Sequence, residues 1–307
     1  MSLHRLSSLT IGVPDVATVA GYYADFGLEQ VAPGRFATVD GGEQLRLEHA
    51  PSRRLLALEI GVDDVEDLEK VARNLDRFEV PTQRTADSLS AVEPVIGVRA
   101  TLRVTPHLIQ PPTPATPYNG PGRADRPNVR APGILREGRV RPRKLGHVVL
   151  GSTDEEATRG FFTDGLGFKV SDRVPGLAAF MRCSTDHHNV LVNSAPASFL
   201  HHTAWQVDDV DEVGRGASAM LEEHPERHVW GLGRHHVGSN FFWYLKDPAG
   251  NFSEYYSDLD EIIDDQLWNP ETVEGARGLF NWGPPPPPSF IHPEDLAGLM
   301  TGAHSAG

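Results

Sequence analysis

The feature that most constrains this chain is an internal repeat. Residues 6–28 read LSSLTIGVPDVATVAGYYADFGL, and residues 145–168 read LGHVVLGSTDEEATRGFFTDGLGF. In both segments a short β-rich run leads into a polar break suited to capping a helix, and a helix-like stretch with two adjacent aromatic residues follows. Each segment then closes on an Asp and a glycine-containing turn. Self-similarity of this kind indicates a duplicated structural unit.

A second pair of segments repeats in the same order. Residues 56–67 (LALEIGVDDVED) match residues 201–212 (HHTAWQVDDVDE), and the two share the motif VDDV. Alternating strand-like residues lead there into an acidic N-cap and a helix. We expect a further strand in each half, near residues 98–104 and 252–256. Two βα units in each half predict a duplicated α+β domain.

Composition shifts mark the domain boundaries. At about 150 residues per domain, a chain of 307 residues predicts roughly two domains. The stretch between the copies is dense in Pro, Gly and Arg, which favours extended irregular chain. We therefore expect an N-terminal domain at 1–104, a linker at 105–143, a C-terminal domain at 144–262 and a tail at 263–307. The tail is either a packed extension or a lid over the second domain.

The charge balance and the residue usage exclude several classes of protein. The chain has 28 Lys and Arg against 42 Asp and Glu, a formal net charge of −14 that repels phosphate backbones and argues against nucleic-acid binding. No run approaches the ~20 apolar residues of a membrane span. The first residues lack a secretory-signal pattern, so we expect a cytoplasmic protein. The single cysteine, Cys183, excludes an intrachain disulfide and a Cys-based zinc knuckle.

Three residues of the second copy predict a metal site. His147 lies in the expected first strand, His202 in the strand of the second unit and Glu254 in the last strand. Two imidazoles and one carboxylate are the ligand set of a facial triad, which leaves open positions on a non-haem Fe(II). Open positions are what a metal needs if a substrate and O₂ are to bind to it together.

The first copy supplies an internal control. When the repeats are aligned, Ser8 stands opposite His147, Ala57 opposite His202, and Thr101 approximately opposite Glu254. None of these three side chains would hold a divalent metal well. One copy with a full ligand set and one copy with none predict one working site and one structural scaffold.

The segment at residues 231–256, GLGRHHVGSNFFWYLKDPAGNFSEYY, carries a longer ordered motif. It reads G-x-G-R-H, then Tyr244 nine residues after His235, then D-P-x-G-N, then Glu254 ten residues after the Tyr. With this motif and the repeat, the chain resembles the two-domain type I extradiol catechol dioxygenases of the vicinal oxygen chelate (glyoxalase–bleomycin resistance–dioxygenase) superfamily. The resemblance covers about residues 1–260.

The resemblance implies a fold and a ligand set. The fold is α+β, with tandem βαβββ modules that form two similar domains, here followed by a C-terminal extension. The implied metal ligands are His147, His202 and Glu254, and the implied metal is Fe(II), although the ligand set does not separate Fe(II) from Mn(II). His201 is adjacent to His202 but points to the opposite face of a strand.

The resemblance also implies catalytic residues. His235 and Tyr244 match residues that hydrogen-bond the bound substrate. An acid–base His is expected just before the second metal His, where RCSTDHHNVLV offers His187 and His188. We choose His187, because its flanks fit the pattern H-x-x-x-L better. His188 stays open, since successive strand residues face opposite ways.

The implied activity is extradiol ring cleavage, in which both atoms of O₂ enter a catechol during the degradation of aromatic compounds. Some members that take acidic catechols carry an Arg five residues before the His of the motif, and this chain has Trp230 there. We therefore expect a neutral or apolar ring substituent, as in an alkylcatechol or 2,3-dihydroxybiphenyl. Phe180, Val237, Trp230 and His188 are the expected substrate contacts, with a core role for Trp230 left open. We also expect a homo-oligomer.

Two other classes of function remain as alternatives. The first is another metalloenzyme on the same fold, such as a glyoxalase-like isomerase or a thiol transferase, but those usually draw ligands from both repeats of a paired unit. The second is a non-enzymatic protein that binds an aromatic compound, since fold alone does not decide function. A pure binder would not need a complete triad.

Overall fold

The computed structural model describes residues 3–274 and 278–300. The N-terminal module contains eight strands and two helices in the order β1 (Leu3–Val13), α1 (Val16–Asp25), β2 (Glu29–Ala32), β3 (Arg35–Thr38), β4 (Gly42–His49), β5 (Arg54–Val62), α2 (Val65–Arg77), β6 (Thr82–Arg84), β7 (Ser88–Val92) and β8 (Arg99–Val104).

The C-terminal module repeats this order with small additions. Its elements are β9 (Lys144–Ser152), α4 (Glu155–Gly160), the π-helical turn η1 (Phe161–Leu166), β10 (Lys169–Val174), β11 (Ala178–Arg182), β12 (Val190–Ser194), β13 (Phe199–Gln206), α5 (Val210–Leu221), the 3₁₀ turn η2 (Pro225–Arg227), β14 (His228–Arg234), β15 (Phe241–Lys246) and β16 (Phe252–Ser257).

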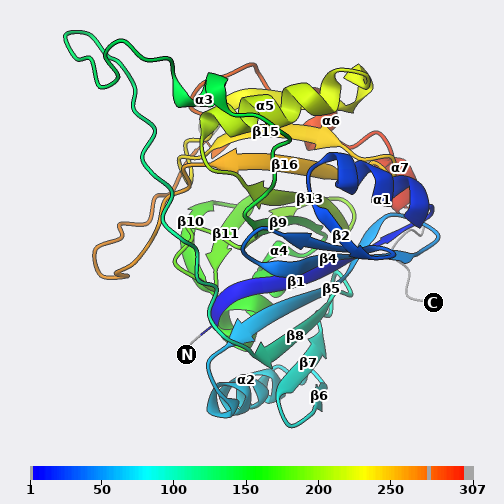
Figure 1. The fold of residues 1–307 in the computed structure, drawn as a ribbon. Helices are drawn as coiled ribbons and strands as arrows, with labels where there is room; N and C mark the ends of the chain where they lie inside the picture. Colours follow the sequence, from blue (N-terminus) through cyan, green and yellow to red (C-terminus); the bar gives the residue numbers. More distant parts are fainter. Residues whose placement is uncertain (1–2, 275–277, 301–307) are drawn as a thin grey trace.

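The two modules have the same sheet topology. The strand order is β2-β3-β4-β1-β5-β8-β7-β6 in one and β10-β11-β12-β9-β13-β16-β15-β14 in the other (Figure 1). Each sheet therefore consists of two βαβββ units, whose first strands pair antiparallel at the centre of the sheet. The predicted α+β fold of two similar domains is confirmed.

The acidic residues before the helices act as caps, as their positions in the repeat predict. The side chains of Asp15, Asp64, Asp154 and Asp209 each accept a hydrogen bond from a backbone N–H in the first turn of the following helix. Such a cap satisfies one of the amides that have no partner within the helix. The same local signal thus starts the corresponding helix in all four units.

The apolar core runs through both modules. Phe26, just after α1, stacks on Tyr255 of β16 with ring centroids 3.9 Å apart, and the Tyr255 hydroxyl donates to the Phe26 carbonyl. On the other side, Gly165 of η1 faces Leu75 of α2, and an added Cβ would come within 2.9 Å of the Leu75 side chain. Helices of one module therefore pack against the other, which fixes the two sheets relative to each other.

The linker and the tail lie outside the sheets. Between β8 and β9 the chain contains one short helix, α3 (Pro132–Leu135), and part of it projects beyond the modules (Figure 1). Arg136 ties this linker to α5 through Asp209 and Glu212. The tail carries α6 (Pro288–Ile291) and α7 (Leu296–Gly298) and returns across the C-terminal module.

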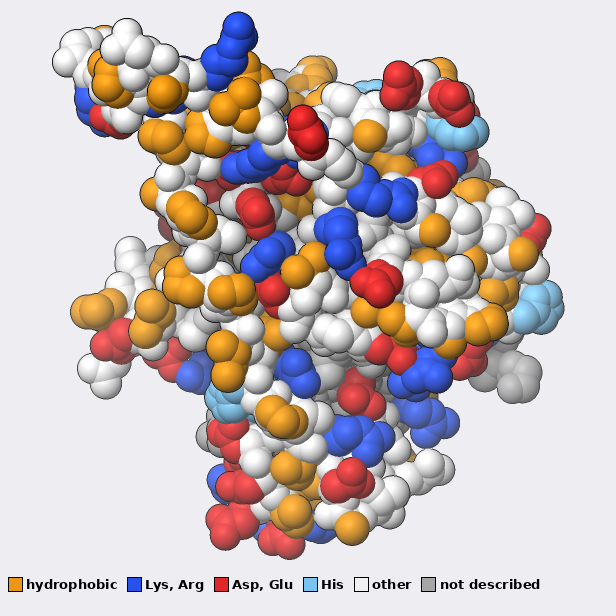
Figure 2. Space-filling view, viewed as in Figure 1, with side chains coloured by type: hydrophobic (Ala, Val, Ile, Leu, Met, Phe, Trp, Pro, Cys, Tyr) orange, Lys and Arg blue, Asp and Glu red, His pale blue; other side chains and the backbone are white. Residues whose placement is uncertain are grey.

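The surface is polar and mixed in charge. On the face drawn in Figure 2, basic and acidic side chains are interspersed rather than separated into patches of one sign. Among the described residues, no helix is both long and apolar enough to span a membrane.

Candidate metal centre

Adjacent strands bring the three predicted ligands together. His147 on β9 pairs with Ala204 on β13, and Ala204 pairs in turn with Glu254 on β16. His202 lies two residues before Ala204 and so shares its face of the sheet. One nitrogen or oxygen atom of each of the three residues lies within 4.8 Å of the others, and all three side chains are buried.

The protonation states of these side chains suit the binding of a metal cation. Burial alone would raise the pKa of the Glu254 carboxyl, but the neighbouring imidazoles, His147 first among them, outweigh it and hold the pKa below its usual range. Burial lowers the pKa of His202 to about 4, so its imidazole is neutral at pH 7. An ionised carboxylate and a neutral imidazole are the forms in which these side chains bind metals.

Hydrogen bonds beside the site fix the tautomer of His202. His201 donates from Nε2 to the carbonyl of Phe290 at 2.6 Å. Burial, and next the proximity of His202, lower the pKa of His201 to about 3, so this neutral ring has no second N–H. Its Nδ1 therefore accepts from Nδ1–H of His202 at 2.8 Å. The bare lone pair of His202 is consequently on Nε2.

That lone pair provides the test of whether a metal fits. His202 Nε2 is buried without a hydrogen-bond partner, and it lies 3.4 Å from Oε2 of Glu254. A lone pair that faces a carboxylate at this distance is unfavourable unless a cation lies between them. Asn240 donates to the other carboxylate oxygen at 3.0 Å and so holds Glu254 in place. The donor set therefore fits a divalent metal bound by His147, His202 and Glu254.

The same positions of the N-terminal module lack such donors. Ser8 pairs with Glu59, which pairs with Thr101, and Ala57 lies two residues before Glu59. The pairing registers thus match the alignment made from the repeats. Glu59 itself forms an ion pair with Arg103 at 3.2 Å, and their side chains are 29% and 37% exposed. This face of the N-terminal sheet is partly exposed to solvent, and Arg103 already balances the charge of Glu59.

A second group of potential donors lies at the edge of the N-terminal module. The rings of His4 and His107 stack with centroids 4.2 Å apart, and His107 Nε2 lies 2.5 Å from Asp63. His107 and Asp63 are exposed. Stacked, parallel rings do not direct two lone pairs at one point, so we interpret this group as an ion pair that ties the start of the linker to the module.

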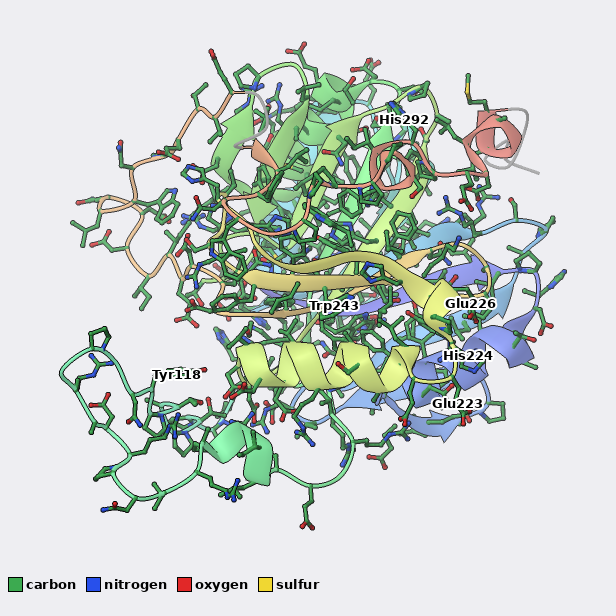
Figure 3. All side chains as sticks on the ribbon, turned by 90° about the horizontal axis from the view of Figure 1, so that it is seen from above. Tyr118, Glu223, His224, Glu226, Trp243 and His292 are labelled. Carbon is green, nitrogen blue, oxygen red and sulfur yellow. The ribbon has the colours of Figure 1, made fainter. Side chains whose placement is uncertain are left out.

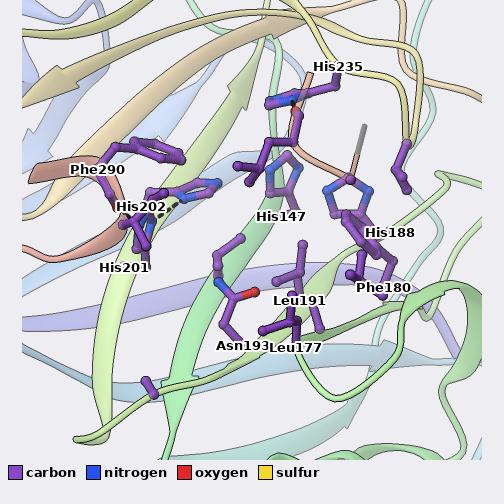
Figure 4. A pocket seen from close by; sticks show the side chains of 18 of the residues that line it. His147, Leu177, Phe180, His188, Leu191, Asn193, His201, His202, His235 and Phe290 are labelled. Atoms are coloured by element: carbon purple, nitrogen blue, oxygen red, sulfur yellow. Dashed lines mark hydrogen bonds between the residues drawn. The ribbon is translucent and has the colours of Figure 1, made fainter. Parts of the chain in front are cut away.

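A cavity of about 300 Å³ opens beside the buried triad (Figure 4). Its walls are mostly apolar. The residues that line it are His147, Val149, Val174, Leu177, Ala178, Phe180, His188, Leu191, Asn193, Ser194, Ala195, Phe199, His201, His202, His235, Val237, Asn240, Tyr244, Gly278, Leu279, Phe290 and Ile291. Phe180, Val237 and His188, three of the expected substrate contacts, are among them.

The structure separates the two candidate acid–base histidines. Both lie in the turn between β11 and β12 rather than in a strand, so alternation does not decide their directions. His188 lines the cavity, and its ring centroid lies 4.1 Å from that of His147. His187 is fully buried behind it, with Nε2 2.8 Å from Asp172 and Nδ1 3.1 Å from Nδ1 of His188. The geometry therefore places His188, not His187, at the site.

His235 and Tyr244, which the resemblance places at the substrate, come together at the cavity. His235 Nδ1 donates to the Leu279 carbonyl, so Nε2 of the neutral ring accepts from the Tyr244 hydroxyl at 2.8 Å. Burial lowers the pKa of His235. Burial, and next the charge of Glu254, raise the pKa of Tyr244 well above its usual value. Tyr244 therefore stays protonated beside the carboxylate.

Trp230 is a packing residue and does not line the cavity. It is 1% exposed, stacks parallel to Tyr244 and contacts Phe242 and Phe290. Its indole Nε1–H donates to the Pro284 carbonyl at 2.7 Å, which anchors the polyproline run of the tail. The expectation that Trp230 contacts the substrate is therefore wrong, and the alternative that it packs in the core is the one observed.

Sequence reasoning missed several contributors to the site. Asn240, which donates to Glu254, lies within the segment 231–256, but nothing in the pattern of that segment singles it out. Leu279, Phe290 and Ile291 reach the cavity from the tail, which is not part of the repeat. The expectation that His201 points to the opposite face from His202 is wrong: both line the cavity, because β13 has a register shift between Leu200 and His202 that interrupts the alternation of the strand.

Comparison with known proteins agrees with this geometry. Residues 144–255 match the family described as the Glyoxalase/Bleomycin resistance protein/Dioxygenase superfamily. Over 155 residues the chain is 40% identical to metapyrocatechase 2 of Cupriavidus necator, covering 50% of this chain and 48% of that protein. It is 29% identical to an iron-dependent extradiol dioxygenase of Rhodococcus jostii, covering 45% of this chain and 50% of that protein. The matches thus span about half the length of these curated relatives.

Solved structures extend the likeness in fold to nearly the whole chain. The Mn(II)-bound glyoxalase from Novosphingobium aromaticivorans superposes with a TM-score of 0.74 at 24% identity, covering 97% of both chains. BphC, a halotolerant catechol dioxygenase, superposes with a TM-score of 0.73 at 19% identity, covering 92% of this chain and 94% of that one. At these identities the likeness establishes the shared two-module fold.

Proposed function

We propose that this chain, whose C-terminal module is a domain of the glyoxalase/bleomycin resistance/dioxygenase superfamily, is a metal-dependent extradiol dioxygenase. It cleaves the ring of a catechol beside the diol and inserts both atoms of O₂. The observation that carries the proposal is the buried lone pair of His202, directed at the ionised Glu254 on the wall of an apolar cavity. Relatives that match about half of the chain are named metapyrocatechase 2 and iron-dependent extradiol dioxygenase, which supports this activity.

We propose Fe(II) as the metal, with Mn(II) as the alternative. His147, His202 and Glu254 would hold it. A bound divalent metal with open positions would supply Lewis acidity toward the two catechol oxygens and a route for electrons between catechol and O₂. The donor set serves either metal. One relative is named as iron-dependent, and another, the 2,3-dihydroxybiphenyl 1,2-dioxygenase of Geobacillus genomosp. 3, as manganese-dependent.

We propose His188 as the group that moves protons. Asp172 accepts from Nε2–H of His187, so His187 Nδ1 accepts from Nδ1–H of His188. This relay leaves Nε2 of His188 as the acceptor for a substrate hydroxyl. Burial, and next the proximity of His147, lower the pKa of His188 well below its usual value, so the ring is neutral at pH 7. A positioned histidine of this kind contributes roughly 10²–10⁴-fold to a rate.

Tyr244 and His235 orient the substrate. The Tyr244 hydroxyl is held by His235 at 2.8 Å and is kept protonated beside Glu254, so it can turn its proton toward a substrate oxygen. Donors fixed in this way stabilise negative charge that develops on oxygen without reorganising during the reaction.

The cavity favours a neutral ring substituent. Among the described residues that line it, no Lys or Arg is present to balance a carboxylate, and most of the wall is aliphatic or aromatic. Burying an unpaired neutral polar group in such an apolar wall costs about 2–7 kcal/mol, and burying an unpaired carboxylate costs more. An alkyl or aryl catechol therefore fits better than an acidic one. Assembly as a homo-oligomer in the cytoplasm stays a prediction.

The test is oxygen uptake by protein loaded anaerobically with Fe(II) or, in parallel, Mn(II). The substrates are catechol, 3-methylcatechol, 2,3-dihydroxybiphenyl and an acidic catechol. We expect one O₂ consumed per substrate with a yellow ring-opened product, and a higher kcat/KM for the neutral catechols than for the acidic one. Metal and catechol binding without O₂ consumption would contradict the proposed activity and favour a non-enzymatic binder.

A further inference from the structure

Arg53 connects the N-terminal module to the catalytic half of the chain. It lies in the loop between β4 and β5, yet its side chain is only 3% exposed. A guanidinium loses its hydration when it is buried, so it needs close polar partners in compensation. All four hydrogen bonds that the structure gives this side chain go to residues of the C-terminal half.

The first partners belong to strands that carry metal ligands. One amino group of Arg53 donates to the Leu200 carbonyl at 2.7 Å, two residues before His202 on β13. The same group lies 3.4 Å from the side-chain oxygen of Asn251, which precedes β16 and Glu254. Arg53 thus contacts the backbone beside one ligand and the turn before another, without touching the cavity.

The other partner belongs to the tail. The remaining two nitrogens form a fork on Asp295, with distances of 2.6 and 2.8 Å to its two oxygens. Asp295 immediately precedes α7 and follows α6, which holds Phe290 and Ile291 on the wall of the cavity. Figure 3 shows α6, with His292 at its end, over the strands of the C-terminal module. A bidentate pair of this kind fixes orientation as well as distance.

Beyond the fork, the tail is held at two points near the cavity. His201 donates to the Phe290 carbonyl, and Leu299 packs with Phe199, whose ring lies 5.8 Å from the Arg53 guanidinium carbon. Between these two points Lys246 pairs with Glu294 and Leu296 packs against the same apolar cluster, while the fork is the contact that joins this segment to the N-terminal module.

We propose that Arg53 is the positioning residue through which the N-terminal module fixes the tail across the metal cavity and so sets the affinity for the ring substituent. The substrate part of this inference rests on the proposed function. The diol end of a catechol would lie at the triad, where Phe290 stands beside Tyr244 and His202 with ring centroids 4.7 and 6.4 Å away. A bulky substituent would extend further along the wall to Ile291, which is 50% exposed, and would therefore depend more on the position of α6 than a small catechol does.

The first arm of the test does not depend on activity. Hydrogen exchange by mass spectrometry is followed in peptides spanning 286–299 of the metal-loaded full chain, for Arg53→Gln, Asp295→Asn and the wild type. The Phe290 and Leu299 amides, which donate to the carbonyls of Pro287 and Asp295, should exchange at least about 10-fold faster in both variants. Because Asp295 is 44% exposed, Asp295→Asn keeps the test valid even if Arg53→Gln folds poorly.

Glu294→Gln is the matched control. Glu294 adjoins Asp295 and pairs with Lys246 at 3.2 Å, but it does not contact Arg53. We expect unchanged exchange in this variant. Unchanged exchange in Arg53→Gln and Asp295→Asn, or an equal increase in Glu294→Gln, would overturn the positioning role.

The second arm measures the effect on the substrate. In Arg53→Gln and Asp295→Asn, KM for 2,3-dihydroxybiphenyl should rise about 10-fold, KM for catechol less than about threefold, and kcat and metal content should stay within about twofold. An equal change in both KM values would overturn the link to the ring substituent. If the wild type cleaves no catechol, the proposed function fails, while the exchange arm still decides whether Arg53 holds the tail.

Discussion

The two modules share a topology and the register of their central strands, but the three positions that form the metal site in one carry other residues in the second. Where the C-terminal sheet carries His147, His202 and Glu254, the N-terminal sheet carries neutral side chains that bind metals poorly. The difference in burial is as large: Glu254 is 0% exposed, whereas Glu59, on the corresponding face, is 29% exposed and paired with Arg103. The shared fold therefore places three side chains near one another in both modules. Only in the C-terminal module are these side chains able to ligate a metal, and only there are they buried.

Part of the cavity wall comes from the tail, which lies outside the repeat. The tail contributes to the wall of the cavity in the C-terminal module, where the Leu279 carbonyl accepts from His235 and the Phe290 carbonyl accepts from His201. These contacts orient rings that face the substrate or the metal. The N-terminal module contributes Arg53 to hold that tail. The scaffold module thus supports the site without supplying a ligand.

The largest expected effect follows removal of a ligand. In Glu254→Ala and His202→Ala, metal affinity should fall by more than the 10–100-fold that loss of an outer partner costs, and turnover should vanish. Metal content after desalting, measured by plasma mass spectrometry, checks this. The matched control is Thr101→Ala, at the position equivalent to Glu254, which should keep full metal content. Loss of metal in the control would end the distinction between the two modules.

The next effect separates the two histidines of the turn. His188→Phe should lower kcat by roughly 10²–10⁴-fold, because a proton-transfer group is lost, while metal and catechol still bind. His187→Phe should lower kcat by about 10-fold, since it removes only the group that orients His188. Single-turnover kinetics on metal-loaded protein measures both. A larger loss in His187→Phe than in His188→Phe would restore the choice made from the sequence.

A smaller effect tests the orientation of His202. His201→Phe removes the acceptor that fixes the tautomer of His202, so metal affinity should fall by about 10–100-fold while the fold is retained. Competition with a chelator measures this affinity. The control is His236→Gln, because His236 pairs with Glu271 outside the lining of the cavity and should leave affinity unchanged. Equal losses in both variants would show that tautomer control is not the cause.

The smallest effect is expected in the N-terminal module. Glu59→Gln breaks a half-exposed ion pair with Arg103, which should change the free energy of unfolding by about 0.2–1 kcal/mol and leave metal content untouched. Urea denaturation followed by circular dichroism measures the change. A loss of several kcal/mol, or of metal, would mean that this face does more than support the fold.

The sequence predicted the parts of the molecule that repeat. The VDDV segments and the capping aspartates gave the strand–helix units, and the alignment of Ser8 with His147 matches the observed register. Both follow from local patterns that two copies confirm in each other. His235 and Tyr244 were expected for a different reason, because they match the motif that carries the family resemblance, and the structure joins them by a hydrogen bond.

The remainder depended on contacts between residues far apart in the sequence. The directions of His187 and His188 are set in a turn by Asp172, 15 residues earlier, so strand alternation could not choose between them. Trp230 packs against the tail through Pro284, which no repeat or motif places. Arg53 reaches Asp295 across 242 residues. Such contacts arise from tertiary packing and leave no periodic signal.

Anomalous diffraction from crystals loaded anaerobically with Fe(II) tests the central claim most directly. The account predicts one strong peak at the iron edge, bonded to His147, His202 and Glu254, and no peak beside Ser8, Ala57 and Thr101. A peak at the His4–Asp63–His107 group instead, or no peak at the triad in protein that retains iron, would contradict the assignment of one working module and one scaffold.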